Sequence, residues 1–222
     1  MAMEQFRLSP STLNLFAECS RCFWLHIKER VHRPSGPFPS LPGGMDSVLK
    51  PYYDKYRLLG KLPPEIEGKV EGKLFPDLAK MNKWRNWHTG LTYTDKKRNA
   101  RLVGALDDLL QIGGRYAALD YKTRGSVINE TSHTYYQLQL DLYTLLLAEN
   151  GLTPVGFGYL IFYSPNKVES GAITHFTAEP VKVETAAESG RSVFERAIEV
   201  LNKEIPPHHS DCEYGLWQHS TL

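Results

Sequence analysis

The sequence predicts an α/β fold in which helices flank a mixed central sheet. One observation is the pair of largely apolar runs around Gly113-Gly114, reading RLVGALDDLLQIGGRYAALDYKTR from Arg101 to Arg124. Two glycines between such runs are typical of a hairpin with a two-residue turn. The other is the order strand, helix, strand across Tyr116 to Tyr163, which is typical of a crossover between parallel strands.

The N-terminal part is predicted to hold two helices. A serine start with proline in the first turn favours a helix over about Pro10 to Glu29. Residues 32–43, HRPSGPFPSLPG, are too rich in Pro and Gly for regular structure. A second helix is expected over about Asp46 to Leu59. The following residues show no sustained period, so we interpret about 60–98 as an irregular insertion.

The central part is predicted to continue with a buried helix and strand. The helix is expected over His133 to Asn150, with Leu138, Leu142, Leu145 and Leu146 on one apolar face, and it stops at Gly151. Val155 to Tyr163 is mostly apolar, as a buried strand should be.

The C-terminal part is predicted to return antiparallel and to end in a helix. We expect a turn around Pro165-Asn166, a strand over Ile173 to Phe176 and a helix over Ala186 to Glu204. A tail of about 205–222 follows. The 222 residues are enough for one domain with its own core, so we assign 1–222 to a single domain.

The hairpin is the most informative part for chemistry. With a two-residue turn, positions that sum to 227 pair across the strands, so Asp107 is predicted to lie opposite Asp120. Opposed carboxylates destabilise a sheet and raise one another's pKa unless a cation lies between them. The strand period places Lys122 on the face of Asp120. Two carboxylates and a lysine on one face predict a hydrolytic metal site.

These residues form part of a longer pattern that resembles the PD-(D/E)XK nuclease superfamily, and within it the RecB-like branch that includes CRISPR-associated RecB-like exonucleases. The resemblance rests on the order and spacing of Gly104-x-x-Asp107, Asp120-Tyr121-Lys122 and Gln139-x-x-x-Tyr143. It implies a restriction-endonuclease-like core.

The resemblance also implies a role for each residue. Asp107, Asp120 and the backbone carbonyl of Tyr121 are expected to bind Mg²⁺ or Mn²⁺. Lys122 is the expected catalytic lysine, which positions or activates the attacking water. The helix that carries Gln139 and Tyr143, also expected catalytic residues, faces the site and the DNA.

Two N-terminal segments extend the resemblance. Leu8 to Leu25 is similar to the family's first helix. The segment GMDSVLK, Gly44 to Lys50, is similar to the first motif, in which a histidine or acid on a helix completes the metal site. Asp46 occupies that place here, and an aspartate is a suitable hard ligand for Mg²⁺.

Charge and hydropathy narrow the class of protein. The net charge is +1, so a nucleic-acid site must come from a local basic patch. Lys96, Lys97 and Arg98 are the candidates, and the alternative is a solvated, variable insertion. Arg124, two residues beyond Lys122, is a further candidate for a phosphate contact. Without a secretory apolar region or a membrane-spanning run, we expect a cytoplasmic protein without a membrane partner.

The cysteines suggest a second metal site. Cys19 and Cys22 have C-x-x-C spacing, and Cys212 lies in HHSDCEYGLW near the C-terminus. Several RecB-like nucleases join their two ends through an iron–sulfur cluster, but three cysteines cannot supply four thiolates. A mixed site with His208 or His209 is suited to zinc or a cluster. The alternative is buried, reduced thiols.

The sequence therefore predicts an Mg²⁺- or Mn²⁺-dependent deoxyribonuclease, more specifically an exonuclease. The expected partner is DNA that is single-stranded or has free ends, in repair, recombination or phage- or CRISPR-related processing. The alternative is a catalytically inactive nuclease fold that serves as a DNA-binding or assembly module. A phosphodiesterase for RNA or a small molecule is a third interpretation.

Overall fold

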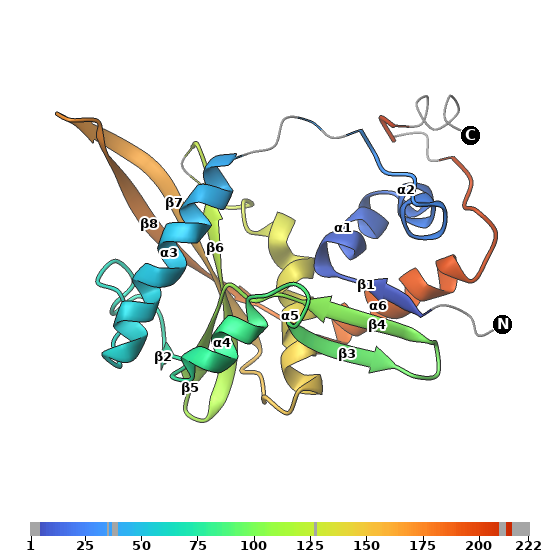
Figure 1. Ribbon diagram of the computed structural model, residues 1–222, viewed down its shortest axis with the longest axis horizontal. Coiled ribbons are helices and arrows are strands. Elements are labelled where there is room, and N and C mark those ends of the chain that lie inside the picture. Colours follow the sequence, from blue (N-terminus) through green and yellow to red (C-terminus); the bar gives the residue numbers. More distant parts are fainter. Residues whose placement is uncertain (1–4, 35, 37–39, 127, 209–211, 215–222) are drawn as a thin grey trace.

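The computed structural model describes residues 5–34, 36, 40–126, 128–208 and 212–214. Its strands form a three-stranded sheet of order β1-β4-β3 and a five-stranded sheet of order β2-β5-β6-β7-β8. The pairs β1–β4 and β6–β7 are parallel and the other pairs are antiparallel. Helices cover these sheets (Figure 1), which confirms the predicted α/β fold with a mixed sheet.

The first segment is broken where one helix was predicted. It consists of β1 (Phe6–Leu8), α1 (Pro10–Glu18), α2 (Ser20–Trp24) and η1 (Leu25–Glu29), a π-helical turn. The break is at Cys19, whose backbone is extended at φ −158° and ψ 109° and whose sulfur accepts a hydrogen bond from the Cys22 N–H. Cys19 is thus both the C-cap of α1 and the N-cap of α2.

The next helix, α3 (Ser40–Leu58), begins earlier than predicted. Residues 40–43 were expected to belong to an irregular loop. Pro42 lies in the first turn, where its missing N–H removes no intrahelical hydrogen bond, so this proline is compatible with the helix.

Residues 60–98 contain regular structure, so the prediction of an irregular insertion is wrong from Lys73 onward. This part contains β2 (Lys73–Leu74), α4 (Leu78–Trp84) and β3 (Leu91–Asp95). The strands are long-range additions to the two sheets, because β2 pairs with β5 and β3 pairs with β4 (Ala100–Gly104). Such pairing leaves little local signal in the sequence.

The predicted hairpin is present but shorter. Strands β5 (Asp108–Ile112) and β6 (Arg115–Thr123) pair in the predicted register, with Ile112 opposite Arg115. Gly113 and Gly114 have φ of 55° and 81°, as the tight turn requires. Residues 101–104, predicted to extend the hairpin, instead belong to β4 in the other sheet.

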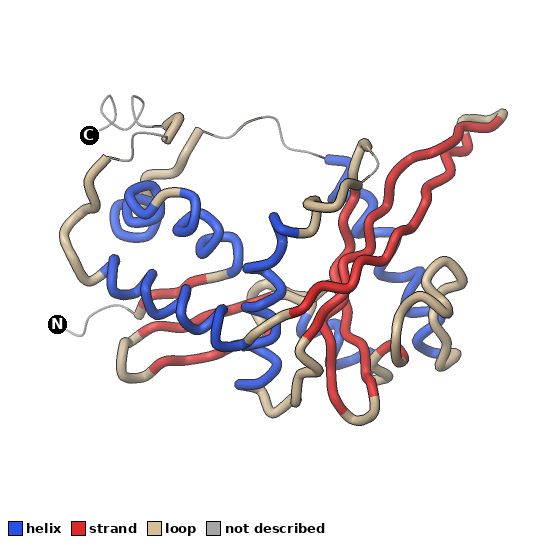
Figure 2. Tube along the Cα trace, turned by 180° about the vertical axis from the view of Figure 1, so that it is seen from behind, coloured by secondary structure: helices blue, strands red, loops and turns tan. Residues whose placement is uncertain are grey.

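The C-terminal half follows the predicted order: η2 (Thr134–Tyr136), α5 (Gln137–Glu149), β7 (Phe157–Glu169), β8 (Ile173–Glu184) and α6 (Ala187–Leu201). The turn is at residues 170–172 and not at Pro165-Asn166. A register shift between Pro165 and Lys167 lets β7 continue past the proline, and Gly171 has a φ of 80° at the turn. The β7–β8 hairpin therefore projects beyond the rest of the fold (Figure 2).

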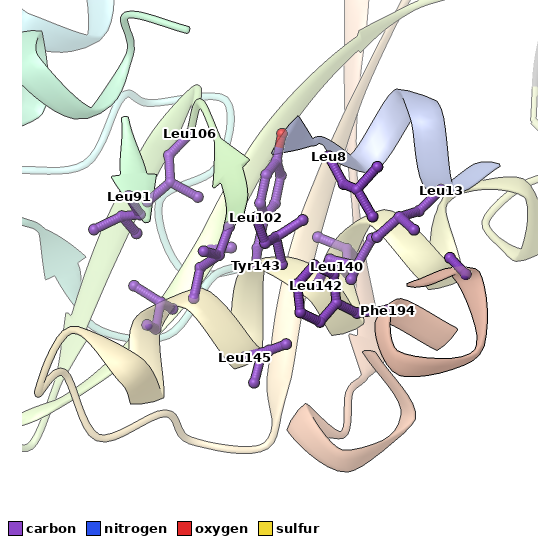
Figure 3. Packing of buried hydrophobic residues seen from close by; sticks show 14 of the residues in the cluster. Leu8, Leu13, Leu91, Leu102, Leu106, Leu140, Leu142, Tyr143, Leu145 and Phe194 are labelled. Carbon is purple, nitrogen blue, oxygen red and sulfur yellow. The ribbon is translucent and has the colours of Figure 1, made fainter. Parts of the chain in front are cut away.

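Helix α5 lies at the centre of the larger of two hydrophobic clusters. Its Leu140, Leu142 and Leu145 pack with Leu13 of α1 and Phe194 of α6 (Figure 3). Burial extends over Leu140–Leu147, so the predicted single apolar face was too narrow. The second cluster lies between α3 and the other face of the five-stranded sheet. Among the described residues, no helix is both long and apolar enough to span a membrane.

A buried ion-pair network fastens α3 and α4 to the sheet. Asp108 is fully buried, and Nη2 of Arg57 lies 2.6 Å from both of its carboxylate oxygens. Nη2 of Arg85 and the Tyr121 hydroxyl donate to the same carboxylate at 3.0 and 2.8 Å. Asp54 accepts from both arginines, at 3.1 Å from Arg57 and 2.7 Å from Arg85. Each buried charge therefore has a partner.

We expect Asp108→Ala to lower the free energy of unfolding by about 3–5 kcal/mol, because it removes the fully buried carboxylate of two buried guanidinium groups and leaves Asp54 as their one carboxylate partner among the described residues. Urea unfolding followed by circular dichroism measures this loss. Glu169→Ala removes the exposed ion pair with Lys167 and is the control, with an expected cost of under about 1 kcal/mol. Equal losses in the two variants would contradict the structural role of the network.

Candidate active site

The structure brings Asp107 and Asp120 together. Asp120 lies in β6 and is only 1% exposed. Asp107 directly precedes β5, and its Oδ2 accepts a hydrogen bond of 3.1 Å from the Tyr121 N–H on the neighbouring strand. Asp107 is thus held beside the Asp120-Tyr121 peptide although the regular ladder starts only at Asp108.

Gln139 of α5 joins the acid and the lysine of β6. Its Nε2 donates to Asp120 Oδ1 at 2.9 Å, and its Oε1 accepts from Lys122 Nζ at 3.0 Å. Lys122 Nζ also lies 2.5 Å from Asp120 Oδ2 and 4.5 Å from the centre of the Tyr136 ring. One amide therefore fixes the position of both charged groups.

Tyr143 lies one helical turn beyond Gln139 and extends the network. Gln139 Nε2 lies 2.8 Å from its hydroxyl, which donates to the Ala105 carbonyl at 2.8 Å. A Cβ at Gly104 would lie 2.5 Å from Leu146 Cδ1 and 3.3 Å from Tyr143 Cε1. Glycine at this position thus lets α5 approach β4, and the Tyr143 hydroxyl points out of the leucine cluster (Figure 3).

The carboxylates are in an environment that suits a cation. Burial, together with the charge of Asp107, raises the pKa of Asp120 to about 7, although Lys122 opposes this shift. Asp120 Oδ2 is buried, and its ion pair with Lys122 Nζ lacks the geometry of a hydrogen bond, so no described residue donates a well-aligned hydrogen bond to this oxygen. A buried oxygen of this kind, beside a second carboxylate, fits Mg²⁺ or Mn²⁺, which prefer carboxylate ligands.

Asp46 reaches this site through Lys50, a residue that sequence reasoning missed. Lys50 Nζ lies 2.6 Å from Asp46 Oδ2 and 3.2 Å from Asp107 Oδ1. Burial lowers the pKa of Lys50, but the charges of Asp107 and Asp46 outweigh this effect and leave the pKa above its ordinary value. The four-residue spacing of Asp46 and Lys50 on a helix was the available signal.

Comparison with known proteins identifies the family. The family model described as PD-(D/E)XK nuclease superfamily matches residues 65–219. The chain belongs to the PD-(D/E)XK nuclease superfamily. Among solved structures it is similar to "Crystal structure of SSO0001", with 13% identity and a TM-score of 0.45, over 99% of this chain and 87% of that one. The search of curated proteins found no match.

Membership of the PD-(D/E)XK superfamily gives the site a coarse function. Its nucleases use divalent metals and act on nucleic acid, so the carboxylates at Asp107 and Asp120 belong to a nuclease fold. The match does not extend to Asp46, because it begins at residue 65.

The proposed DNA contacts lie in different places. Arg124 directly follows β6, and its N–H donates to the Tyr163 carbonyl at 3.0 Å. Lys96, Lys97 and Arg98 lie in the β3–β4 turn, at the end of β4 remote from Gly104 (Figure 1). Arg98 pairs with Asp95 and with Glu195 of α6 at 2.9 and 3.1 Å. The structure thus brings Arg124 near the nuclease residues but not the β3–β4 turn.

The three cysteines form a cluster. Their sulfur atoms all lie within 4.8 Å of one another, and those of Cys22 and Cys212 are 3.5 Å apart. Burial raises the pKa of the Cys22 thiol to about 11. Burial also raises that of Cys19, but hydrogen bonds from Cys22 outweigh it and leave the pKa below its usual value. The exposed His208 is not part of this group of ligand atoms, and His209 lies outside the described residues.

We expect Asp120→Asn to stabilise the metal-free protein more at pH 8 than at pH 5. The pKa of Asp120 is about 7 in the folded protein and has its ordinary lower value in the unfolded chain, so wild-type stability falls as pH rises between these values. Asparagine removes this loss. Thermal unfolding in EDTA at both pH values measures the difference.

Glu71→Gln is the matched control. The hydrogen bond from Lys182 lowers the pKa of the exposed Glu71, which is the opposite shift, so we expect no stabilisation at pH 8. An equal effect of Asp120→Asn at the two pH values would contradict the raised pKa.

Proposed function

We propose that the protein is an Mg²⁺- or Mn²⁺-dependent DNA nuclease of the RecB-like branch, acting as an exonuclease. The observation that carries this proposal is the single network in which Gln139 binds both Asp120 and Lys122. The order of these residues along the chain, with Asp107 and Asp120 before a Gln-x-x-x-Tyr helix, supports the RecB-like assignment.

Asp107, Asp120 and the Tyr121 carbonyl are the proposed metal ligands. Lys50 supports Asp46 as a further ligand, because its ammonium group is a cation that already joins the Asp46 and Asp107 carboxylates. When bound, the metal ion supplies polarisation of the scissile phosphate and a lower pKa of the attacking water.

Lys122 is the proposed catalytic lysine. Gln139 and Asp120 hold its ammonium group beside the carboxylates, where it can orient the attacking water and offset the charge that develops on the phosphate. Water oxygen forms the new bond to phosphorus as the bond to the 3′ oxygen breaks, which gives a 5′-phosphate and a 3′-hydroxyl. Gln139 and Tyr143 act by positioning these groups.

The proposed substrate is DNA with a single strand or a free end. Arg124 lies two residues beyond Lys122, directly after the end of β6, which supports a contact to a neighbouring phosphate. Lys96, Lys97 and Arg98 contribute only if the DNA follows the β3–β4 hairpin away from the site. DNA repair, recombination and phage- or CRISPR-related processing are the settings that require such an activity.

Cleavage of end-labelled single- and double-stranded DNA tests the proposal. We expect degradation with Mg²⁺ or Mn²⁺, none with EDTA, and a loss of at least about 100-fold in rate for Lys122→Ala, as for removal of a group that stabilises developing charge. Lys61→Ala changes an exposed lysine and is the control. The order in which the two end labels are released gives the polarity.

Two results would contradict this function. Cleavage that is unaffected by Lys122→Ala would remove the lysine from the mechanism. Retained DNA binding without cleavage under any metal condition would instead support the inactive DNA-binding or assembly module.

We also propose that Cys19, Cys22 and Cys212 bind zinc, and that His208, which lies outside the group of sulfur atoms in this structure, moves in as the fourth ligand. Tetrahedral zinc with Zn–S bonds of about 2.3 Å holds its sulfur atoms about 3.8 Å apart, close to the 3.5 Å between Cys22 and Cys212. Neighbouring contacts join the same two segments: Arg21 Nη1 donates to the Pro206 carbonyl at 2.8 Å, and Arg33 lies 4.6 Å from the Tyr214 ring centre.

Metal analysis of anaerobically purified protein tests this site. We expect one equivalent of zinc, its loss in Cys22→Ser, and a lower melting temperature of that variant, because metal binding stabilises the folded state. Iron with visible absorption would indicate a cluster completed by a ligand from outside the chain. Absence of both metals would support reduced thiols.

A further inference from the structure

A pocket lies beside the nuclease residues and is not used by the proposed mechanism. Its volume is about 480 Å³, and it lies between the β1–α1 junction, the end of β4 and helix α5. Arg7, Ser9, Ser11, Trp87, Gln139 and Tyr143 are among the residues that line it. The volume is within the range of sites for small organic ligands, about 300–1,000 Å³.

The pocket is continuous with the catalytic face. Gln139 and Tyr143 line it, and Gln139 also donates to Asp120. Ala105, whose carbonyl accepts the Tyr143 hydrogen bond, is a further wall residue two positions before Asp107. The pocket and the acid site therefore share the Gln139 side chain.

The walls suit a ligand that is both flat and anionic. Trp87 is 64% exposed, and the His88 ring packs on its indole with centroids 3.4 Å apart. Arg7 contacts Trp87 in two ways: its Nη2 donates to the Trp87 carbonyl at 3.0 Å, and its guanidinium lies 5.6 Å from the indole centre. Ser9 and Ser11 add hydroxyls, and none of the described residues that line the pocket carries a carboxylate.

We propose that this pocket binds one unpaired nucleotide next to the scissile phosphate, with its base stacked on Trp87 and its phosphate near Arg7. The proposal rests on the proposed nuclease function and defines its substrate more closely. An indole stacks on any base, whereas Arg7 supplies the charge for phosphate. A base can stack on Trp87 only where it is not already stacked within a duplex, so the substrate is a single strand or an end with an unpaired nucleotide.

Binding of fluorescent oligonucleotides with a single abasic site, moved along the strand, tests this pocket without cleavage. The parent is Asp120→Asn, compared with the same protein carrying Trp87→Ala or Trp87→Phe. We expect one abasic position to weaken binding by the parent about tenfold, in line with base stacking on an aromatic side chain. The same position should have no effect on the Trp87→Ala protein, and Trp87→Phe should restore most of the effect.

Two variants complete the design. Arg7→Gln should lower the salt dependence of binding by about one ion, as expected for one phosphate contact. Val168→Ala changes an exposed side chain on the β7–β8 hairpin and should bind like the parent. Circular dichroism spectra and a cooperative thermal unfolding transition confirm that each variant is folded.

The outcomes separate this proposal from the nuclease function. An abasic cost that is equal with and without Trp87, or unchanged affinity of Trp87→Ala, would overturn the nucleotide pocket while wild-type cleavage still establishes the nuclease. Absence of metal-dependent cleavage by the wild type, with the Trp87-dependent abasic cost retained, would overturn the nuclease and leave a single-strand-binding site.

Discussion

The fully buried carboxylate of Asp108 is the constraint on which the active site depends. Arg57 and Arg85 bind it inside the fold, and the Tyr121 hydroxyl donates to it from the neighbouring strand. Arg85 Nε also donates to the Asp107 backbone carbonyl at 2.8 Å. Because adjacent strand side chains point to opposite faces, fastening Asp108 on one face presents Asp107 on the other. An ion pair that contributes no chemistry thus orients a proposed metal ligand.

The side chains of β6 are likewise divided between a structural face and a catalytic face. Tyr121 points to the Asp108 network, while Asp120 and Lys122 point to Gln139 of α5. The amide matches both neighbours, since its oxygen accepts from the ammonium group and its nitrogen donates to the carboxylate. A glutamate at this position would place a third negative charge beside Asp120. A leucine would leave Asp120 and Lys122 with their mutual ion pair but without the hydrogen bonds from the amide. The close approach of α5 at Gly104 makes this contact possible.

The parts of this arrangement that could be predicted from the sequence are local. The register of the hairpin follows from the Gly113-Gly114 turn, and the shared face of Asp120 and Lys122 follows from the strand period. Other features depend on distant partners: the break at Cys19, the departure of β4 into a second sheet, and the placement of Lys50 between two carboxylates. The role of Asp108 could not be predicted, because its sequence context does not distinguish a buried anchor from a solvated acid. Its two arginines lie 51 and 23 positions away.

Helix α1 connects the pocket, the cysteine cluster and the hydrophobic core. Its first turn, at Ser9 and Ser11, lines the pocket beside Gln139, and its last residue precedes Cys19 of the cysteine cluster. Leu13 on its inner face packs in the core with α5. A rigid helix held at its C-terminal end and along its side has little freedom to move its N-terminal end. Binding of the proposed zinc therefore restrains the pocket wall formed by Ser9 and Ser11, whereas Trp87 lines the pocket from the segment between α4 and β3. Substitutions in the cysteine cluster should then change affinity for DNA together with stability, and substitutions at Trp87 should change affinity alone.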